Sequence, residues 1–494
     1  MLTLTPRSRI VVDNAALLPV ASKLAEDLPG ITGWRLPVMV RNTAHAGDIV
    51  LSLSLCNTAL TATIGTEGNT FYAKRVVVLR SATTTGAFYA TRTLLQMVML
   101  DGRPANKHVH VPKGFAVDYP IYGERSLMFD VARKFASKDF LIQYMKFMSW
   151  YKLNTLHLHL NDFAIDAGGN TVVSFRLKSS DPAFKGPLSD DGQYYTEQDW
   201  RDMEAEAAAD SITIVPEFDT PGHSQAFGKA RPDLADASGF LDPTKPDALA
   251  YVESVFHQFL PWFKSGRIHI GGDEVANFSA SQSVPYLNSL SAFLQRHGKT
   301  VQAWGDQNYL TAFNTQLTIG LNKSVWIQRW INWGSEASIN YKHAGYDWTD
   351  SYGDWYIVPF GPSYFNPKGL SGTTVYDAWA TKPQADSMQY PPIGEQLCVW
   401  NDNGASRTYT YETDVHALLR DAVPAVGQIS WSGQQRDANG SVVPYSMVGA
   451  NLAMLGYGPG ANKLTGSLTN PSASHAISRD AHLPNGTLAG GSIP

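Results

Sequence analysis

Asp273 and Glu274 are adjacent carboxylates that follow a short apolar stretch of the chain, and this placement is the strongest sign of chemistry in the sequence. In residues 267–270 the isoleucines alternate with longer polar side chains, as they do in a buried strand. Gly271 and Gly272 then allow a ligand or another backbone to approach closely. Because neighbouring carboxylates resist double ionisation, one can act as an acid while the other stays charged. The alternative is a surface turn in which the pair caps a helix.

Beyond about residue 120 the chain alternates between short apolar runs and stretches with helical periodicity. Helices are predicted at residues 137–151, 196–208, 246–259 and 285–296. Strands are predicted at residues 126–131, 155–160, 212–218, 268–270, 300–304, 324–330, 355–358 and 396–400. Strands that alternate with helices in this way predict an α/β fold, the parallel (β/α)8 TIM barrel. The alternative is a doubly wound sheet, but this chain has no glycine-rich phosphate loop after the first predicted strand.

The predicted barrel covers residues 116–460 and has a separate unit on each side. Residues 1–115 are predicted to form a small α+β domain. Because they contain no cluster of charged or nucleophilic side chains, we interpret this unit as a supporting domain. Its expected strands and helices are residues 10–12, 15–28, 49–55, 72–79 and 86–97. Residues 461–494 are rich in Gly, Ser, Asn and Pro and are predicted to be a surface tail.

Composition and charge exclude several classes of partner. A net charge of −5 gives no reason to expect nucleic acid, and no run of 18 apolar residues predicts a membrane span. No secretory signal is visible, so we expect the mature chain of a secreted or extracellular protein, with a cytoplasmic location as the alternative. His157 and His159 alternate along one strand, but nothing completes a zinc set, so no metal and no cofactor are expected.

Polar and aromatic residues gather at the ends of the predicted strands, which converge on one face of a barrel. In chain order they are Asp130, Arg133, His159, Asn161, Asp162, Glu217, Asp219, His223, Asp273, Glu274, Trp304, Trp330, Tyr352, Asp354, Tyr356, Trp400, Asn401 and Asp402, with Arg125 at the start of the first strand. Indoles stack on sugar rings, whereas Arg and Asp bind hydroxyls, so the set suits a carbohydrate. Each residue also has a structural alternative: a lone Trp is usually core, and Asp219 and His223 could simply cap a turn.

The motifs at these positions resemble those of the β-N-acetylhexosaminidases of glycoside hydrolase family 20. The matching segments are residues 125–133, 152–162, 214–224, 269–274 and 400–402. The resemblance runs from about residue 120 to 460, and the first 115 residues fit the small α+β domain that often precedes this barrel. Several independent motifs in the right order make the resemblance specific.

This resemblance implies a retaining exo-glycosidase that releases terminal β-linked N-acetylhexosamine from an oligosaccharide or glycoconjugate by substrate-assisted catalysis. The 2-acetamido oxygen of the substrate would attack the anomeric carbon and form an oxazolinium intermediate. Glu274 would be the general acid and then the base, and Asp273 would orient the acetamido N–H and stabilise positive charge. Tyr356 would donate a hydrogen bond to the acetamido oxygen.

The resemblance also assigns supporting roles. Arg125 would bind hydroxyls of the terminal sugar, and Asp402 would bind O4 or O6. Asp162 and His223 would support the acid/base residue. Three tryptophans would form the walls of the pocket: Trp304, Trp330 and Trp400.

One departure leaves the product open. Many family members carry Tyr-Leu-Asp after the seventh strand, whereas this chain has the sequence Asp-Trp-Tyr-Ile-Val-Pro at residues 354–359. That variant resembles the branch containing lacto-N-biosidases, which release a disaccharide. Such an activity is therefore one alternative, and a carbohydrate-binding protein without turnover is another. The oligomeric state is not predicted.

Overall fold

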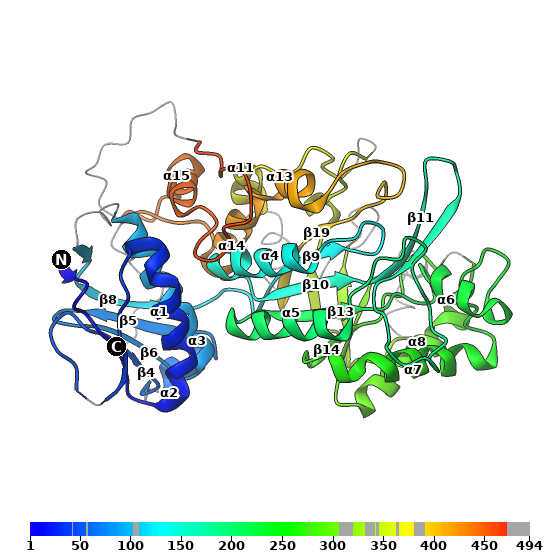
Figure 1. Ribbon diagram of the computed structural model, residues 1–494, viewed down its shortest axis with the longest axis horizontal. Coiled ribbons are helices and arrows are strands. Elements are labelled where there is room, and N and C mark those ends of the chain that lie inside the picture. The colour runs from blue at the N-terminus through cyan, green and yellow to red at the C-terminus, as the bar shows by residue number, and fades with distance from the viewer. Residues whose placement is uncertain are drawn as a thin grey trace.

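The computed structural model describes residues 1–41, 43–55, 58–101, 108–275, 277–305, 320–330, 341, 345–361, 365–379 and 391–471, and the statements below concern these residues. They form two domains that lie side by side, a smaller N-terminal domain drawn in blue and a larger barrel (Figure 1). Residues 472–494, most of the predicted surface tail, lie outside the described part of the chain.

A closed parallel barrel forms the larger domain, and the predicted fold class is confirmed. Its eight strands within the described residues are β9 (Glu124–Asp130), β10 (Thr155–His159), β13 (Thr213–Glu217), β14 (Arg267–His269), β15 (Thr300–Trp304), β16 (Val325–Arg329), β17 (Trp348–Asp350) and β19 (Gly394–Val399). The first strand, β9, pairs with β10 on one side and with β19 on the other, and β17 also pairs with β19. These pairings close the sheet, so the ends of all eight strands surround one axis.

The seventh strand differs from the prediction. It was expected at residues 355–358, but the strand that joins β16 to β19 is β17. A short 3-10 helix (Gly353–Trp355) then bends the chain, and β18 (Tyr356–Ile357) pairs with the end of β19. The run Trp348–Asp350 is only three residues long and ends in a charged residue, so it carries little of the strand signal used in the prediction.

Helices cover the outside of the barrel, and three of the four predicted ones begin within one residue of the predicted start, whereas α8 begins five residues before residue 285. Ser137 caps α4 (Lys138–Trp150) by accepting the N–H of Phe140, and Thr196 forms a capping box with Asp199 at α5 (Glu197–Ala209). The other helices are α6 (Gln225–Ala230), α7 (Pro246–Phe259), α8 (Ala280–Arg296), α11 (Gly372–Thr374), α13 (His416–Leu419), α14 (Ala422–Ser432) and α15 (Tyr445–Leu455). Further single turns are Ala15–Leu17, Pro232–Leu234, Leu260–Trp262, Val375–Trp379 and Tyr411–Val415. An antiparallel hairpin of β11 (Asn161–Ile165) and β12 (Thr171–Phe175) projects from the barrel (Figure 1).

The N-terminal domain is a six-stranded sheet with helices packed against it. Its strand order is β3 (Val38–Val40), β2 (Ile10–Val12), β4 (Ile49–Ser52), β6 (Val77–Ser81), β5 (Asn69–Ala73) and β8 (Gly114–Asp118). The helices are α1 (Leu18–Thr32), α2 (Thr58–Ile64) and α3 (Thr84–Leu100), and β1 (Leu2–Leu4) pairs with β7 (Val109–Val111). The single strand predicted at residues 72–79 is wrong, because residues 74–76 turn the chain between β5 and β6. That turn contains no Gly or Pro, the usual signals.

Contacts between α1 and α5 and between α3 and α15 join the two domains. The smaller domain lies at the end of the barrel where the strands begin, so the opposite end, where they finish, stays available for a site (Figure 1). No helix among the described residues is both long enough and apolar enough to cross a lipid bilayer.

Candidate active site

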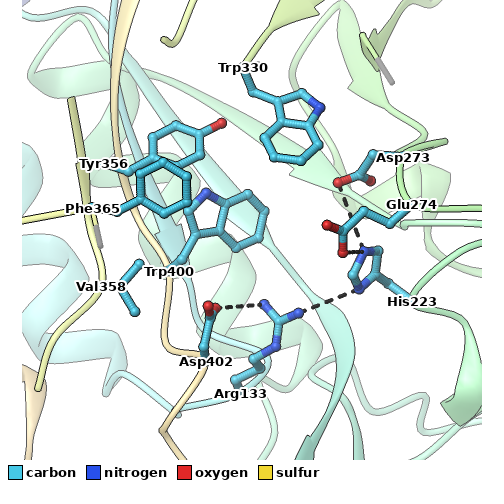
Figure 2. Close-up of a pocket in the computed structure, with 10 residues that line it drawn as sticks. All are labelled: Arg133, His223, Asp273, Glu274, Trp330, Tyr356, Val358, Phe365, Trp400 and Asp402. Carbon is cyan, nitrogen blue, oxygen red and sulfur yellow. Dashed lines mark hydrogen bonds and ion pairs between the residues drawn. The ribbon is translucent and has the colours of Figure 1, made fainter. Parts of the chain in front are cut away.

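A pocket of about 440 Å³ opens at the ends of the barrel strands. Its lining residues, drawn in Figure 2, are Arg133, His223, Asp273, Glu274, Trp330, Tyr356, Val358, Phe365, Trp400 and Asp402. They come from segments that follow six different strands, and carboxylates face aromatic rings across the pocket. The size and the mixture of apolar and polar groups are typical of a site for a small organic ligand.

Two glycines place the carboxylate pair. Gly271 and Gly272 have φ values of +70° and +94°, which L side chains rarely adopt. A Cβ at Gly271 would collide with the carboxylate of Asp219, so that residue also provides the close approach expected from the sequence. The chain then reaches Glu274, whose own φ is +48°. Non-glycine residues in this conformation are uncommon and cost energy, so the surrounding contacts must hold Glu274 in place.

Asp273 lies deep in the pocket, and its environment favours the protonated form. Burial, opposed by the charge of His223 and reinforced by Glu274, raises the pKa of Asp273 to about 6. Burial and the nearby Asp273 carboxylate raise the pKa of Asp219 well above its usual value. One oxygen of Asp273, Oδ1, is buried and has no hydrogen-bond partner within the described protein. A buried oxygen without a hydrogen-bond partner can accept a hydrogen bond from a bound ligand.

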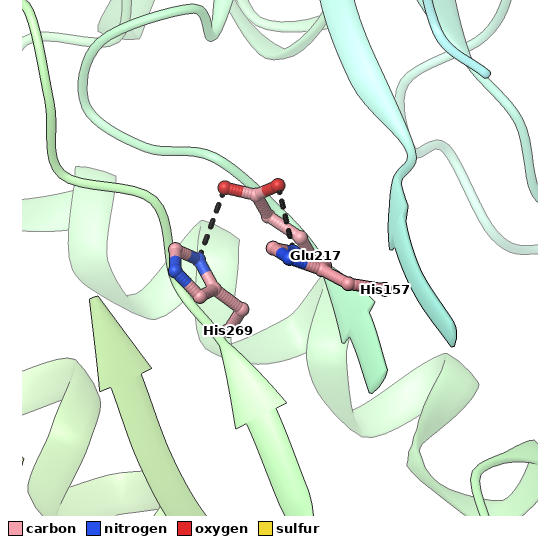
Figure 3. Close-up of side chains that lie close together, drawn as sticks. All are labelled: His157, Glu217 and His269. Atoms are coloured by element: carbon pink, nitrogen blue, oxygen red, sulfur yellow. Dashed lines mark ion pairs between the residues drawn. The ribbon is translucent and has the colours of Figure 1, made fainter. Parts of the chain in front are cut away.

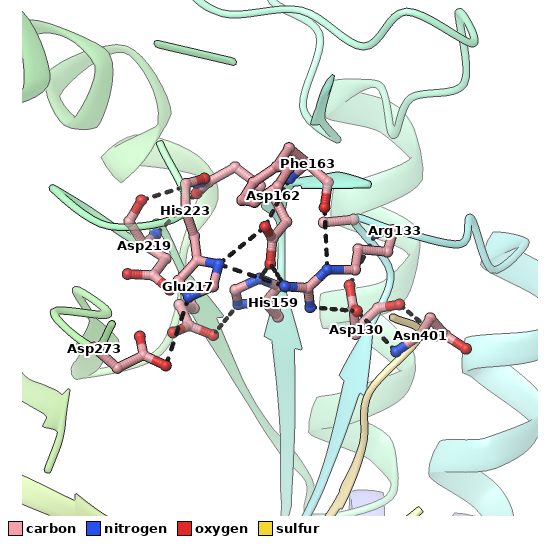
Figure 4. A network of polar contacts seen from close by, with 12 residues as sticks. Asp130, Arg133, His159, Asp162, Phe163, Glu217, Asp219, His223, Asp273 and Asn401 are labelled. Carbon is pink, nitrogen blue, oxygen red and sulfur yellow. Dashed lines mark hydrogen bonds and ion pairs between the residues drawn. The ribbon is translucent and has the colours of Figure 1, made fainter. Parts of the chain in front are cut away.

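His223 links the acid pair to a buried ionic network (Figure 4). Its Nε2 lies 3.4 Å from Glu274 Oε2 and 3.8 Å from Asp273 Oδ2. On the other edge of the ring, Nδ1 lies 3.0 Å from Asp162 Oδ1. Burial alone would lower the pKa of His223, but the carboxylates of Asp162, Asp219 and Asp273 outweigh it and raise that pKa well above the usual value. His223 is therefore a cation, and its hydrogen bond lowers the pKa of Glu274.

Asp162 is the centre of this network. Its Oδ2 accepts from Arg133 Nη2 at 2.8 Å and from His159 Nε2 at 2.7 Å, so both of its oxygens are occupied. Despite complete burial, the positive charges of Arg133 and His223 hold the pKa of Asp162 far below its usual range. Asp162 does not line the pocket. It fixes the positions of two residues that do.

Below the pocket, Glu217 is surrounded by imidazoles (Figure 3). One ring nitrogen each of His157 and His269 and one carboxylate oxygen of Glu217 lie within 4.8 Å of one another, and this spacing suits the ligands of a metal ion. However, Glu217 Oε1 accepts from Trp304 Nε1 at 2.6 Å, and Oε2 accepts from His159 Nδ1 at 2.7 Å. Both oxygens are thus satisfied without an ion. Burial lowers the pKa of His269 to about 4, so this imidazole is neutral.

Aromatic side chains form the wall opposite the carboxylates. Tyr356 and Trp400 have ring centroids 6.1 Å apart, and Trp330 belongs to the same buried cluster. The hydroxyl of Tyr356 is buried and, within the described protein, has no hydrogen-bond partner. Trp304, expected to line the pocket, packs behind Trp400 at 5.5 Å and is 1% exposed. Its indole N–H donates a hydrogen bond to Glu217. The expectation that Trp304 lines the pocket is therefore wrong, and Trp304 instead packs behind the residues that do.

Arg125 is the second correction, because it lies at the wrong end of the barrel. It sits near the start of β9, fully buried, and its guanidinium donates to Glu67 Oε2 and to the carbonyl of Lys152, both at 2.7 Å. Glu67 belongs to the N-terminal domain, so Arg125 joins the two domains. Arg133, which follows the end of the same strand, lies in the pocket instead, with Nη1 3.7 Å from Asp402 Oδ1.

Two lining residues, Val358 and Phe365, were not predicted. They lie in the segment after β18, where a single apolar residue carries no sequence signal for a site. Arg133 follows the end of β9, and this position after the strand is the sequence signal that would have favoured Arg133 over Arg125.

Comparisons with known proteins point to one family for both domains. Residues 122–413 match the model of the catalytic domain of glycosyl hydrolase family 20, and residues 1–119 match that of domain 2 of the same family. A beta-N-acetylhexosaminidase of Cellulomonas fimi is 26% identical over 457 residues, which cover 87% of each chain. Beta-hexosaminidase subunit A2 of Dictyostelium discoideum is 26% identical over 444 residues, 79% of this chain and 77% of that protein. These relatives differ in length, and the matched part of this chain covers between 51% and 87% of the length of each relative.

The fold also matches a solved structure. The beta-N-acetylhexosaminidase from Streptomyces coelicolor superposes with a TM-score of 0.69 at 23% identity, and the match covers 92% of both chains. At this identity the likeness extends to the fold alone.

Proposed function

The chain belongs to glycosyl hydrolase family 20 and is a glycoside hydrolase, and we propose that it releases a terminal β-linked N-acetylhexosamine with the acetamido group of the substrate as the nucleophile. One observation carries this proposal. Asp273 Oδ1 and the hydroxyl of Tyr356 are buried atoms of the same pocket, and neither has a hydrogen-bond partner among the residues that the structure describes. The first can accept a hydrogen bond and the second can donate one. An acetamido group, with one N–H and one C=O, satisfies both.

In the first step Glu274 gives its proton to the glycosidic oxygen while the acetamido oxygen attacks the anomeric carbon. The bond to the leaving group breaks, and the product is a cyclic oxazolinium ion. Asp273 accepts the acetamido N–H and its negative charge stabilises the ion, while Tyr356 holds the attacking oxygen in line. In the second step Glu274 removes a proton from water, which attacks the anomeric carbon and opens the ring. Two displacements at one carbon retain the β configuration.

The electrostatics of the site suit an acid that later becomes a base. With the pocket open to water, the His223 cation keeps Glu274 charged, which is the form that the second step needs. A bound sugar displaces water, and loss of hydration raises the pKa of a carboxyl group, which favours the protonated form for the first step. His223 stays in place because Asp162 holds its other nitrogen.

The sugar ring would lie against Trp400, with its hydroxyls near Arg133 and Asp402. The Arg133 guanidinium lies 5.7 Å from the Trp400 ring, and Asp130 and Asp162 fix its orientation. A planar guanidinium beside an indole offers hydrogen bonds to hydroxyls next to an apolar surface for the ring.

The test compares two chromogenic glycosides, 4-nitrophenyl N-acetyl-β-glucosaminide and 4-nitrophenyl β-glucoside. The acetamido substrate should be cleaved and the glucoside, which lacks the internal nucleophile, should not. Proton NMR of the first product should detect the β anomer. Equal rates on both glycosides, or an α anomer formed first, would rule out the proposed mechanism. Binding of N-acetylglucosamine without any cleavage would support a carbohydrate-binding protein.

A further inference from the structure

Phe365 stands between the pocket and a second cavity. That cavity has a volume of about 280 Å³, and its described lining residues are Gly353, Asp354, Trp355, Phe365, Asn366, Leu370, Thr374 and Ala378. Among the described residues, Phe365 alone lines both spaces. Its ring meets Tyr356 edge-on at a centroid distance of 5.4 Å. The ring is therefore a partition between two neighbouring cavities.

The backbone around this partition is fixed. The N–H of Val358 donates to the carbonyl of Phe365 at 3.0 Å, and the side-chain amide of Asn366 donates to the carbonyls of Asp354 and Tyr356 at 2.8 and 2.7 Å. Phe365 and Asn366 have φ values of +52° and +51°, a conformation that non-glycine residues adopt only when contacts hold it. These hydrogen bonds hold the main chain of Phe365 and Asn366 against β18. Removal of the Phe365 ring should therefore leave the backbone in place and open a gap between the two cavities.

The partition lies on the side of the pocket away from the leaving group. Figure 2 shows Phe365, Tyr356 and Val358 on one side of Trp400, and Glu274 with His223 on the other. In the proposed reaction Glu274 marks the bond that breaks, so the leaving group extends past Glu274. The opposite side faces the non-reducing end of the glycan, where an exo-acting enzyme must limit how much sugar enters.

We propose that Phe365 sets how many sugar units the enzyme releases, by closing the pocket beyond the N-acetylhexosamine ring. This inference rests on the proposed function. Behind the ring, the second cavity is lined by Asp354 and Thr374 together with Trp355, while the Asn366 amide is already bonded to backbone carbonyls, and this mixed polar and aromatic lining suits a neutral hexose. Replacement of the ring by a methyl group joins the two spaces and creates a subsite for a hexose attached to the N-acetylhexosamine.

The experiment compares wild type with Phe365→Ala and Phe365→Tyr. Phe360→Ala is the matched control, because Phe360 lies on the same segment, has a φ of +56° and packs on Tyr409 without lining either cavity. The substrates are 4-nitrophenyl N-acetyl-β-glucosaminide and the 4-nitrophenyl β-glycosides of Galβ1-3GlcNAc and Galβ1-4GlcNAc. The measured quantity is the ratio of kcat/KM for a disaccharide glycoside to kcat/KM for the monosaccharide glycoside.

Phe365→Ala should raise this ratio about tenfold or more for at least one disaccharide, with Phe365→Tyr and Phe360→Ala near wild type. An unchanged ratio in Phe365→Ala, an equal rise in Phe360→Ala, or efficient disaccharide release by wild type would overturn the proposal. If no variant cleaves any substrate, the proposed function fails separately. Calorimetric titration with GlcNAc and the two free disaccharides then still tests the partition, since Phe365→Ala alone should gain affinity for a disaccharide relative to GlcNAc.

Discussion

Replacement of Tyr356 by Phe removes a single hydroxyl group that has no hydrogen-bond partner in the described part of the chain, and we expect activity and stability to change in opposite directions. A buried hydroxyl without a hydrogen bond costs about 1–3 kcal/mol of folding free energy, because water has been removed and nothing replaces it. Tyr356 is 2% exposed and its hydroxyl is unpaired within the described protein. Phe at this position should therefore leave stability unchanged or raise it by up to that amount.

Activity should fall in the same variant. The hydroxyl is the donor that would hold the acetamido oxygen as it attacks, and removal of one such preorganised donor costs about 10²–10³ in kcat. The assay is kcat/KM on 4-nitrophenyl N-acetyl-β-glucosaminide, together with the midpoint of thermal unfolding. The loss should appear mainly in kcat, because the hydrogen bond strengthens as charge develops on the ring that forms.

Tyr195→Phe is the matched control. The hydroxyl of Tyr195 is buried and donates to the carbonyl of Ala136 at 2.7 Å, and neither residue lines the pocket. Its removal leaves that carbonyl unpaired, so stability should fall by about 1–3 kcal/mol while kcat stays at the wild-type value. The reasoning is refuted if Tyr356→Phe melts below wild type and keeps normal turnover, since its hydroxyl would then serve the protein and not the substrate.

Three further predictions concern charged residues. Because the pKa of Asp273 is raised to about 6 and the reaction needs its charged form, kcat/KM should fall about tenfold per pH unit below 6; Asp273→Asn should be slow at every pH, and a pH profile that is flat from 7 to 5 would contradict this role. Arg133→Lys should lower kcat/KM with little change in melting temperature, whereas Arg125→Lys should lower the melting temperature and leave KM unchanged; the reverse result would reinstate Arg125 as the sugar-binding residue. Asp162→Asn should weaken the hold on His223, and because the contacts with His223 affect the pKa of Glu274 more than the opposing charge of Asp162 does, that pKa should rise and the optimum of a pH–rate profile should move upward; an unmoved optimum would show that Asp162 does not act on Glu274 through His223.

The elements most faithfully predicted from the sequence are those whose signals are local. The helices predicted at residues 137–151 and 196–208 depend on residues a few positions apart, and they appear in the structure as α4 and α5 within one residue of the predicted bounds. The turn at residues 74–76 and the three-residue β17 lack such signals. Pairing with neighbouring strands stabilises them, and that information is not contained in a short window of sequence.

The site residues divide in the same way. Position at the end of a strand placed Asp273, Glu274 and Trp400 on the pocket wall, because parallel strands bring their ends together. The same rule assigns Arg125 to the other end of the barrel, so the role that the resemblance gives to Arg125 does not agree with its position in the fold. Phe365 lies outside the reach of either approach, since its role comes from a space between segments that only the folded chain forms.

A destabilising arrangement in the barrel, the buried carboxylate of Asp273, is also one that the proposed chemistry needs. Burial that raises the pKa of Asp273 from 3.8 to about 6 implies a cost of ~3 kcal/mol for keeping the carboxylate charged at pH 7, at 1.36 kcal/mol per pKa unit. The folded-state pKa is raised, so this cost is absent below about pH 4, grows between pH 4 and 6 and stays constant at higher pH. A protein selected for stability alone would place Asn there. The retention of a buried charge beside an unpaired tyrosine hydroxyl is therefore best explained by a ligand that satisfies both, and an acetamido sugar does so.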